Sequence, residues 1–263
     1  MAWVLAMRDY FTMMRAAGRS DLTIRLHRHY LHQLWETNPL PWKVKTPDLL
    51  ELLSRPTWGA ESRKSARSVY RGFYGWAVMA GRMDDNPAIN LPTVRVSPGT
   101  PRPTPEGIAQ GAMHNCDPRI SFMAMLAGYC GLRAGEIAKV HQFDFDAATS
   151  RLVIHGKGRK ERVIPIVQTD LAAMLGDVQG WAFPGRTEGH LSSGHVTVLL
   201  SRAMPDQWTA HTMRHRAGTK AYRGTRDIYA VARMLGHSRT ETTQRYVQLD
   251  DDALLAALTA SAA

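Results

Sequence analysis

A proline-rich stretch at residues 91–105 divides this chain of 263 residues into two parts. It contains five prolines: Pro92, Pro98, Pro101, Pro103 and Pro105. Proline lacks a backbone N–H and clashes with the preceding helical turn, so the stretch cannot form a helix. Because the chain is also longer than one typical hydrophobic core requires, we interpret the stretch as an extended linker. The predicted domains are residues 1–90 and 106–263.

The first part of the chain reads as a helical domain. The predicted helices span residues 4–17, 21–36, 47–53 and 61–80. Gly18 and Gly81 are natural helix stops, because glycine adopts left-handed backbone angles without strain. Ser20 and Thr46 are expected N-caps, and Pro47 suits a first helical position.

Basic residues are concentrated in this first part. The whole chain has 33 Lys and Arg against 23 Asp and Glu, a formal net charge of +10. Residues 1–104 hold 15 basic and 8 acidic residues, a net of +7, which leaves +3 for the remainder. A positive surplus favours polyanionic partners and makes their binding salt dependent. Charge by itself excludes neither RNA nor an anionic membrane.

Six residues of the second part are suited to chemistry on a phosphodiester. Displacement at this anionic group requires fixed cations around the non-bridging oxygens, a proton acceptor and a proton donor. Arginine can hold two phosphate oxygens at once, and a lysine beside arginines can donate a proton near neutral pH. A tyrosine hydroxyl can attack and keep the intermediate covalent. The candidate set is Arg133, Lys157, His211, Arg214, His237 and Tyr246.

Lys157 lies in a glycine-flanked turn between two predicted strands, residues 151–155 and 161–166. Its glycine neighbours let the backbone approach a large ligand closely. Arg159 and Lys160 share this turn, and Lys160 is the alternative candidate for the proton donor. Two strands among many helices give a fold class that is mainly α with a small β-sheet.

Taken singly, these motifs have simpler explanations. Glu136 could merely pair with Arg133 or Lys139 at an ordinary helix start. A basic glycine turn is usually a solvated hairpin, and a lone Tyr246 would more often pack in a core. Only the joint occurrence of the motifs favours the chemical interpretation.

We predict neither a metal site nor a redox site. His211 and His215 have the i, i+4 spacing of a zinc pair, but no third ligand is evident and Arg214 would repel a cation. Cys116 and Cys130 give no disulfide framework and lie near apolar sequence, so we expect buried thiols in a reducing compartment.

Four segments together resemble the tyrosine recombinases, with phage integrases and Xer-like recombinases as the nearest types. They are residues 131–136, 156–162, 211–215 and 235–246. The resemblance covers the second half of the chain in the family's order. It implies a SAM-like helical core-binding domain and a catalytic domain that close on DNA as a C-shaped clamp. We expect a short member of the family, without an arm-binding domain.

The resemblance also implies a role for each candidate. Arg133 and Arg214 would clamp the scissile phosphate, with Glu136 and His215 in support. His211 would assist proton transfer from the nucleophile, and His237 would donate a hydrogen bond to a non-bridging oxygen.

Lys157 would protonate the departing 5′ hydroxyl while Tyr246 becomes joined to the 3′ phosphate. Because the phosphotyrosine conserves the energy of the broken bond, the resemblance implies no ATP, no metal and no other cofactor.

The helix predicted over residues 61–80 then has a DNA-facing side. Val69, Phe73, Trp76 and Ala80 fall on one stripe, as core residues do. The predicted DNA-binding residues lie on another face of this helix and in the lysine turn: Arg63, Lys64, Arg67, Arg71, Arg159 and Lys160. The alternative is that the basic helix face is ordinary solvated surface.

Residues 253–258 predict a short terminal helix that follows three aspartates, which suit a helix N-terminus. By resemblance it would pack into a neighbouring protomer of a homotetramer. The alternative is that it packs on its own domain or frays.

The sequence is interpreted as that of a site-specific DNA recombinase, in first place a phage or prophage integrase acting through a 3′-phosphotyrosine and a Holliday junction. The alternatives are a Xer-like chromosome or plasmid resolvase, a non-catalytic DNA-binding regulator and a type IB topoisomerase. Expected partners are double-stranded attachment or core sites, a homotetramer on synapsed DNA, and an accessory DNA-bending or directionality protein.

We expect the bacterial host cytoplasm as the location, at the nucleoid when the protein is active. The N-terminus has no basic region ahead of its short apolar stretch, as a secretion signal would. The longest apolar run, residues 120–132, is too short to span a bilayer.

Overall fold

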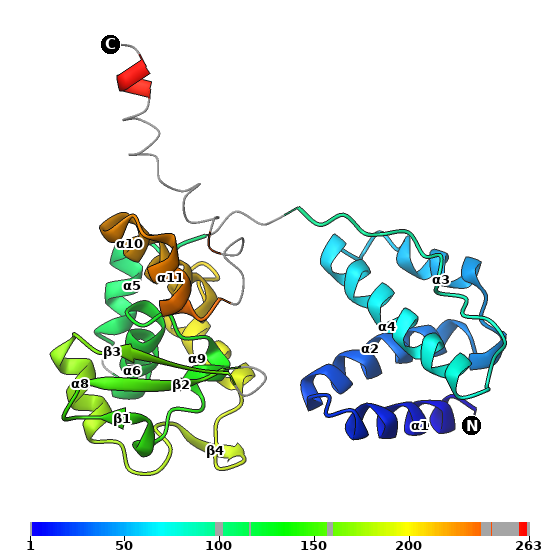
Figure 1. Cartoon of the computed structure of the whole chain (residues 1–263), viewed down its shortest axis with the longest axis horizontal. Coiled ribbons are helices and arrows are strands. Elements are labelled where there is room, and N and C mark those ends of the chain that lie inside the picture. The colour runs from blue at the N-terminus through cyan, green and yellow to red at the C-terminus, as the bar shows by residue number, and fades with distance from the viewer. Residues whose placement is uncertain are drawn as a thin grey trace. The chain divides into compact units, whose positions relative to one another are not determined.

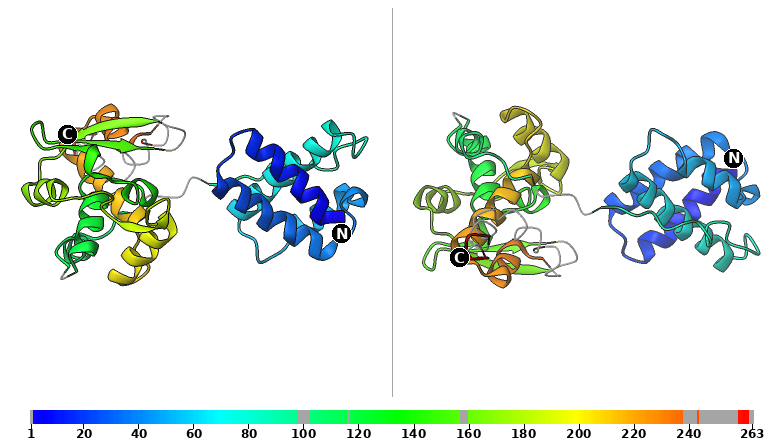
Figure 2. Two further views of the ribbon diagram at one scale, coloured as in Figure 1. Left: turned by 90° about the horizontal axis from the view of Figure 1, so that it is seen from below. Right: turned by 90° about the horizontal axis from the view of Figure 1, so that it is seen from above.

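The structure, a computed structural model, describes residues 2–97, 102–115, 117–156, 160–237, 243 and 258–261. The chain divides into two compact units, Met1–Pro98 and Gly99–Ala263, each with its own hydrophobic core (Figures 1 and 2). The N-terminal unit is helical, and the C-terminal unit combines helices with a small sheet. The predicted fold class, mainly α with a small β-sheet, is confirmed.

The N-terminal unit contains the predicted helices, each placed to within two residues at either end. They are α1 (Ala2–Ala16), α2 (Asp21–Thr37), α3 (Thr46–Leu53) and α4 (Ala60–Met79), with a 3-10 turn η1 (Pro41–Lys43) that was not predicted. Gly18 and Gly81, just beyond α1 and α4, have φ of 66° and 64°, as expected of helix stops.

One of the two predicted N-caps is confirmed, and the other is wrong. Ser20 caps α2, with its side chain accepting from the N–H of Thr23. Thr46 does not cap α3, because the helix begins at Thr46 itself and Lys45 is the N-cap. The Thr46 hydroxyl instead donates to the carbonyl of Pro87 at 2.8 Å, which ties α3 to the segment that follows α4.

Phe73 is at the centre of an aromatic core in the N-terminal unit. It is fully buried and stacks on Trp3 and Trp42, with ring centroids at 5.6 and 6.0 Å. Tyr10 meets it edge-on at 5.3 Å. Such pairs add to the stabilisation from burial alone. The core therefore joins α1, η1 and α4.

The predicted apolar stripe of α4 is nearly correct. Val69, Phe73 and Trp76 are buried, as expected. Ala80 is exposed, because α4 ends at Met79 and Ala80 is its C-cap residue.

The C-terminal unit is built around α6. Its helices are α5 (Glu106–Met113), α6 (Pro118–Gly128), α7 (Ala134–Ile137), α8 (Thr169–Gly176), α9 (Ser193–Ala203), α10 (Ala210–Thr225) and α11 (Ile228–Leu235), with a 3-10 turn η2 (Gln142–Asp144). From Ile120 to Gly128 every residue of α6 is buried, and the helix packs against α5, α8, α9 and α10. Within the described part of the chain, no helix combines the length and apolar character needed to cross a bilayer.

A small antiparallel sheet covers part of this unit (Figure 1). Its strands are β1 (Phe145–Asp146), β2 (Arg151–His155) and β3 (Glu161–Pro165), in that order. The predicted strands are β2 and β3; β1 and the isolated β4 (Pro184–Thr187) were missed. Arg162 pairs with Ile154 and therefore lies on the same face as that buried side chain.

The proline-rich stretch is anchored at both ends. Its described residues, 91–97 and 102–105, form neither helix nor strand. Leu91 is buried in the N-terminal core. Thr104 is buried in the C-terminal unit, where its N–H and hydroxyl donate to the carbonyl and hydroxyl of Thr212 at 3.1 and 2.8 Å. Each end of the stretch thus belongs to the unit beside it.

One expected buried thiol is confirmed. Cys130 is buried in the C-terminal core, and this burial raises the pKa of its thiol to about 12. A thiol in this environment is unreactive at neutral pH. Cys116 lies outside the described residues.

Candidate active site

The first arginine motif forms a tight turn between α6 and α7. Gly131 has a φ of 65°, and a Cβ built on it would lie 2.4 Å from Cδ2 of Leu235, so the position requires glycine. Arg133 is the N-cap of α7, and its backbone N–H donates to Oε2 of Glu136 at 2.9 Å. The side chain of Arg133 is 45% exposed, whereas that of Glu136 is 5% exposed. The turn therefore buries the carboxylate and leaves the arginine accessible.

The second arginine motif lies on α10. His211, Arg214 and His215 follow one another at helical spacing and share a face of the helix. Arg214 is buried, and its guanidinium donates to the carbonyls of Gly131 and Leu235, the latter at 2.6 Å. His211 is exposed and His215 buried, with ring centroids 4.3 Å apart.

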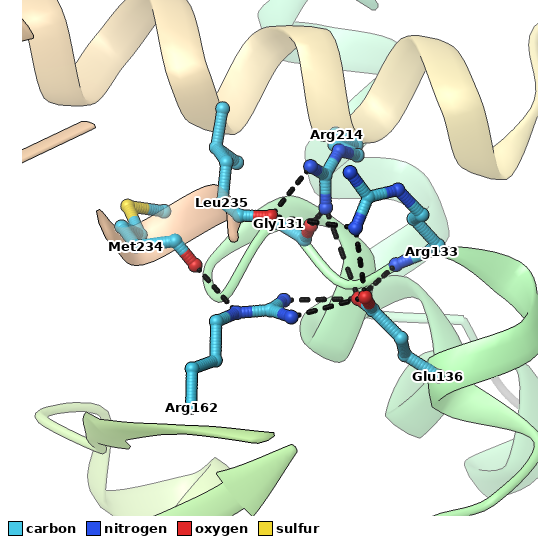
Figure 3. A network of polar contacts seen from close by, with 7 residues as sticks. All are labelled: Gly131, Arg133, Glu136, Arg162, Arg214, Met234 and Leu235. Carbon is cyan, nitrogen blue, oxygen red and sulfur yellow. Dashed lines mark hydrogen bonds and ion pairs between the residues drawn. The ribbon is translucent and has the colours of Figure 1, made fainter. Parts of the chain in front are cut away.

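Glu136 connects the two motifs (Figure 3). Its Oε1 accepts from Nη1 of Arg133 at 2.8 Å, and Arg162 donates to both carboxylate oxygens at 3.0 and 2.9 Å. Nη1 of Arg214 is 3.8 Å from Oε2. Burial alone would raise the pKa of Glu136, but hydrogen bonds from Arg162 and Arg133 outweigh it, so this pKa lies below its ordinary value. The carboxylate stays ionised among three guanidinium groups.

The end of α11 completes this cluster. The carbonyl of Leu235 accepts from Arg214 and, at 3.5 Å, from Nη1 of Arg133. Gly236 then ends the helix with a φ of 64°. His237 follows directly, with its Nδ1 2.8 Å from the hydroxyl of the buried Thr243. His237 is thus two residues from a carbonyl that both motif arginines contact.

The structure describes only part of the lysine turn and does not describe the candidate nucleophile. Lys157, Arg159 and Tyr246 lie outside the described residues. At the base of the turn, the N–H of Gly156 donates to the carbonyl of Lys160 at 2.7 Å. A Cβ built on Gly156 would lie 3.9 Å from Oε1 of Glu136, so the base of the turn adjoins the arginine cluster.

The predicted C-terminal helix, residues 253–258, also falls largely outside the described part. Residues 258–261 are helical, and Leu258 is exposed.

The basic residues of α4 differ in exposure and in the hydrogen bonds that they make. Lys64 is exposed, whereas Arg63, Arg67 and Arg71 are half-buried. Arg63 donates to the carbonyl of Arg55 at 3.3 Å, and Arg67 to that of Leu91 at 3.0 Å. Two side chains of the basic face, Arg63 and Arg67, therefore also form hydrogen bonds within the N-terminal unit. Their binding role remains a prediction.

The arrangement is suited to an anionic ligand. Three guanidinium groups face one carboxylate, which leaves a local surplus of two positive charges. Arg133 carries part of this surplus to the surface. Arg162 was not among the predicted site residues, although the sequence held a signal: it alternates with Ile164 and so places a charge on the core face of β3.

Known proteins resemble this chain in sequence and in fold. The profile described as the Phage integrase family matches residues 108–253, more than half of the chain. A tyrosine recombinase XerC of Corynebacterium efficiens is 28% identical over 272 residues, covering 95% of this chain and 87% of the relative. A XerC of Rhodospirillum centenum is 32% identical over 228 residues, covering 75% of this chain and 64% of the relative.

The fold has counterparts among solved structures. A lambda integrase dimer bound to a COC′ core site matches with a TM-score of 0.73 and 17% identity, covering 93% of each chain. At this identity the likeness concerns the fold alone.

Fold, arginine site and relatives together define a class, the enzymes that recombine DNA. This chain belongs to the phage integrase family: it is a tyrosine recombinase, which cleaves and rejoins DNA strands. The expectation of a phage integrase in the narrower sense is less well supported than the Xer-like alternative, because the XerC relatives match along most of the chain.

Proposed function

We propose that the chain is a Xer-type site-specific recombinase, which exchanges strands between two double-stranded DNA sites through a covalent 3′-phosphotyrosine on Tyr246. The observation that carries the proposal is the gathering of Arg133 and Arg214 on the Glu136 carboxylate and the Leu235 carbonyl. The XerC relatives support the Xer-type role, because they match nearly the full chain.

The two motif arginines are proposed to hold the scissile phosphate. Arg214 is fixed by two backbone carbonyls and is the rigid part of the site. Arg133 is anchored to Glu136 through Nη1, and its partly exposed guanidinium can turn toward a phosphate oxygen. Fixed cations of this kind stabilise the charge that builds up on the non-bridging oxygens during displacement.

The proton transfers are assigned to the remaining candidates. His211, exposed on α10, would assist removal of the proton from Tyr246, with His215 beside its ring in support. His237 would donate to a non-bridging oxygen, and its ring is oriented by Thr243. Lys157 would protonate the departing 5′ hydroxyl, with Lys160 as the alternative. None of these steps calls on a metal or on ATP.

The N-terminal unit is proposed to be the core-binding domain. Its share of the net charge and the partly engaged basic residues of α4 support contact with the DNA backbone. The proline-rich stretch at residues 91–105 would be the linker that lets the two domains close around the duplex. A homotetramer on synapsed DNA, with the C-terminal residues exchanged between protomers, is part of the same proposal.

A covalent trap tests the chemistry. The full-length protein is incubated with nicked duplexes that span candidate sites, and adducts that survive denaturation are counted. Wild type should form such an adduct, and Tyr246→Phe should bind the DNA but form none, because the phenyl ring has no hydroxyl to attack with.

Other outcomes would change the proposal in defined ways. Wild type that shifts DNA in a native gel without forming an adduct would support a binding regulator. Supercoil relaxation without a defined site would support a type IB topoisomerase. An adduct at a phage attachment site, with integration but no resolution of directly repeated sites, would support an integrase.

A further inference from the structure

In the arginine cluster of Figure 3, Arg162 donates a hydrogen bond from each of its three side-chain nitrogens. Its Nη1 and Nη2 donate to the two oxygens of Glu136 at 3.0 and 2.9 Å. Its Nε donates to the carbonyl of Met234, near the end of α11, at 2.9 Å. One guanidinium thus joins strand β3, the first arginine motif and the last turn of α11.

This engagement separates Arg162 from Arg133. Its side chain is 13% exposed, compared with 45% for Arg133. Each of its three nitrogens already donates inside the protein. A phosphate could take both terminal nitrogens of this fork only by displacing the buried carboxylate. Arg162 is therefore poorly placed to bind substrate directly.

We propose that Arg162 is a positioning residue of the recombinase, which occupies the Glu136 carboxylate so that Arg133 remains available to the scissile phosphate. Glu136 is buried and ionised, so it requires cationic partners. Arg162 supplies two of its hydrogen bonds through the planar fork. Arg133 contributes a single side-chain bond through Nη1.

Loss of Arg162 would redistribute these contacts. A carboxylate without its bidentate partner would draw in the nearest remaining guanidinium groups. Arg133 is already 2.8 Å away through one nitrogen, and Arg214 is 3.8 Å away. An arginine that turns fully toward Glu136 is lost to the phosphate, so the rate of cleavage falls although the nucleophile is intact.

The bond to Met234 extends this role to α11. The carbonyls of Met234 and Leu235 accept from Arg162 and Arg214, respectively. These bonds fix the helix end from which His237 follows. Glycine at position 236 is part of the arrangement, because a Cβ built there would lie 2.8 Å from Nη1 of Arg162.

The experiment measures the rate of adduct formation at saturating full-length protein, for wild type and Arg162→Gln. Two substrates are used: ordinary DNA and DNA with a 5′-bridging phosphorothiolate. In the latter, tyrosine attack expels a thiolate that needs no proton. Arg162→Gln should slow adduct formation roughly 10- to 100-fold on both substrates, as expected for a misplaced catalytic group. DNA affinity should change little.

A double-mutant cycle tests whether Arg133 is the residue that Arg162 positions. In an Arg133→Lys background, Arg162→Gln should reduce the rate on phosphorothiolate DNA by much less than in wild type, because the arginine it positions is gone. A merely structural role would give the same factor in both backgrounds. Arg151→Gln is the matched control: it removes an exposed arginine from the neighbouring strand and should leave the rate unchanged.

Arg162→Lys provides a second variant should Arg162→Gln fold poorly. It keeps the charge beside Glu136, but a single ammonium cannot reproduce the bidentate fork and the Met234 bond, so we expect a smaller loss with the same pattern. Equal rates for wild type and Arg162→Gln, recovery on phosphorothiolate DNA, or full additivity with Arg133→Lys would each overturn the positioning role.

The inference rests on the proposed function, but the two fail differently. Wild type that forms no adduct on either substrate would overturn both. A wild-type adduct with an unimpaired Arg162→Gln variant would overturn the role of Arg162 alone.

Discussion

Each unit of this recombinase contains a distinctive cluster of side chains, and the two clusters differ in kind. In the N-terminal unit, aromatic rings surround Phe73 at centroid distances of 5.0 to 6.0 Å. In the C-terminal unit, three arginines surround the carboxylate of Glu136. One cluster is aromatic and mostly buried, whereas the other is ionic and reaches the surface through Arg133.

The two kinds of cluster contribute differently to the stability of the protein. Buried rings gain free energy from the area they remove from water and from their mutual geometry. Buried ions lose hydration, and their attraction offsets this loss only when the geometry and the hydrogen bonds are good. The arginine cluster is therefore a weak argument for stability, and it is consistent with the proposed role in phosphate binding.

Burial in the N-terminal core also affects three tyrosine hydroxyls. Burial raises the pKa of Tyr10 to about 12 and also raises the pKa values of Tyr70 and Tyr74. These tyrosines are core residues of the N-terminal unit and poor nucleophiles. The assignment of Tyr246 as the nucleophile remains a prediction.

The largest effect should come from breaking the aromatic cluster. Phe73→Ala should lower the free energy of unfolding of the N-terminal unit by about 3–5 kcal/mol, because it leaves a cavity among large rings. Urea unfolding followed by tryptophan fluorescence measures this change, since Trp3, Trp42 and Trp76 contact the Phe73 ring or its neighbours.

The cluster in the other unit should be unaffected by this substitution. Hydrogen exchange of α6 amides reports on the C-terminal core and should be the same in Phe73→Ala and wild type. Parallel losses of protection in both units would show that they do not unfold independently.

Alanine substitution of two glycines at helix ends should have a smaller effect on stability, and the two positions can be compared directly. Gly18 and Gly236 have φ of 66° and 64°, so alanine at either position should cost about 1–2 kcal/mol of unfolding free energy. A Cβ on Gly18 meets nothing within 4 Å, whereas one on Gly236 would meet Arg162. Gly236→Ala should therefore also slow adduct formation, and Gly18→Ala should not.

Chemical denaturation and the covalent trap measure the two quantities on the same variants. Gly18→Ala is the control for backbone strain, since it carries the same conformational penalty in open surroundings. If both variants formed adducts at the wild-type rate, the contact between Gly236 and Arg162 would be irrelevant to the site.

Much of this molecule could be predicted from its sequence where the signals are local. The helices of the N-terminal unit, strands β2 and β3, and the motif arginines follow from periodicity, glycine stops and short motifs. The errors at Thr46 and Ala80 are shifts of one residue at helix ends, where local signals are weakest. Strand β1, with two residues, is too short to leave a periodic pattern.

The arginine network could not be predicted in the same way. Glu136 and Arg162 are 26 residues apart, and Arg214 meets Leu235 across 21 residues. Such contacts depend on how α7, α10, α11 and β3 pack, which no local pattern encodes. The partial engagement of Arg63 and Arg67 with backbone carbonyls is likewise a tertiary feature that the basic stripe alone does not reveal.

The smallest expected effect concerns one histidine in each unit. His27 lies 3.0 Å from the hydroxyl of Tyr10, and burial, followed by the charge of Arg19, lowers its pKa below 6.5. His155 lies between Asp144 and Glu161, at 2.8 and 2.9 Å. The hydrogen bond that His155 donates to Asp144 is the main cause that raises its pKa above 6.5.

Opposite shifts give opposite pH dependences. A depressed histidine pKa means that the unfolded chain binds more protons, so the N-terminal unit should lose stability as pH falls below 6.5. A raised pKa means that the folded state binds more protons, so the contribution of His155 is full below 6.5 and is lost as pH rises through its folded value. NMR titration of both rings, with hydrogen exchange of the β2–β3 amides, measures these effects. Asp144→Asn should return the midpoint of His155 toward 6.5 and leave His27 unchanged; a His155 midpoint that did not move would show that Asp144 is not the cause.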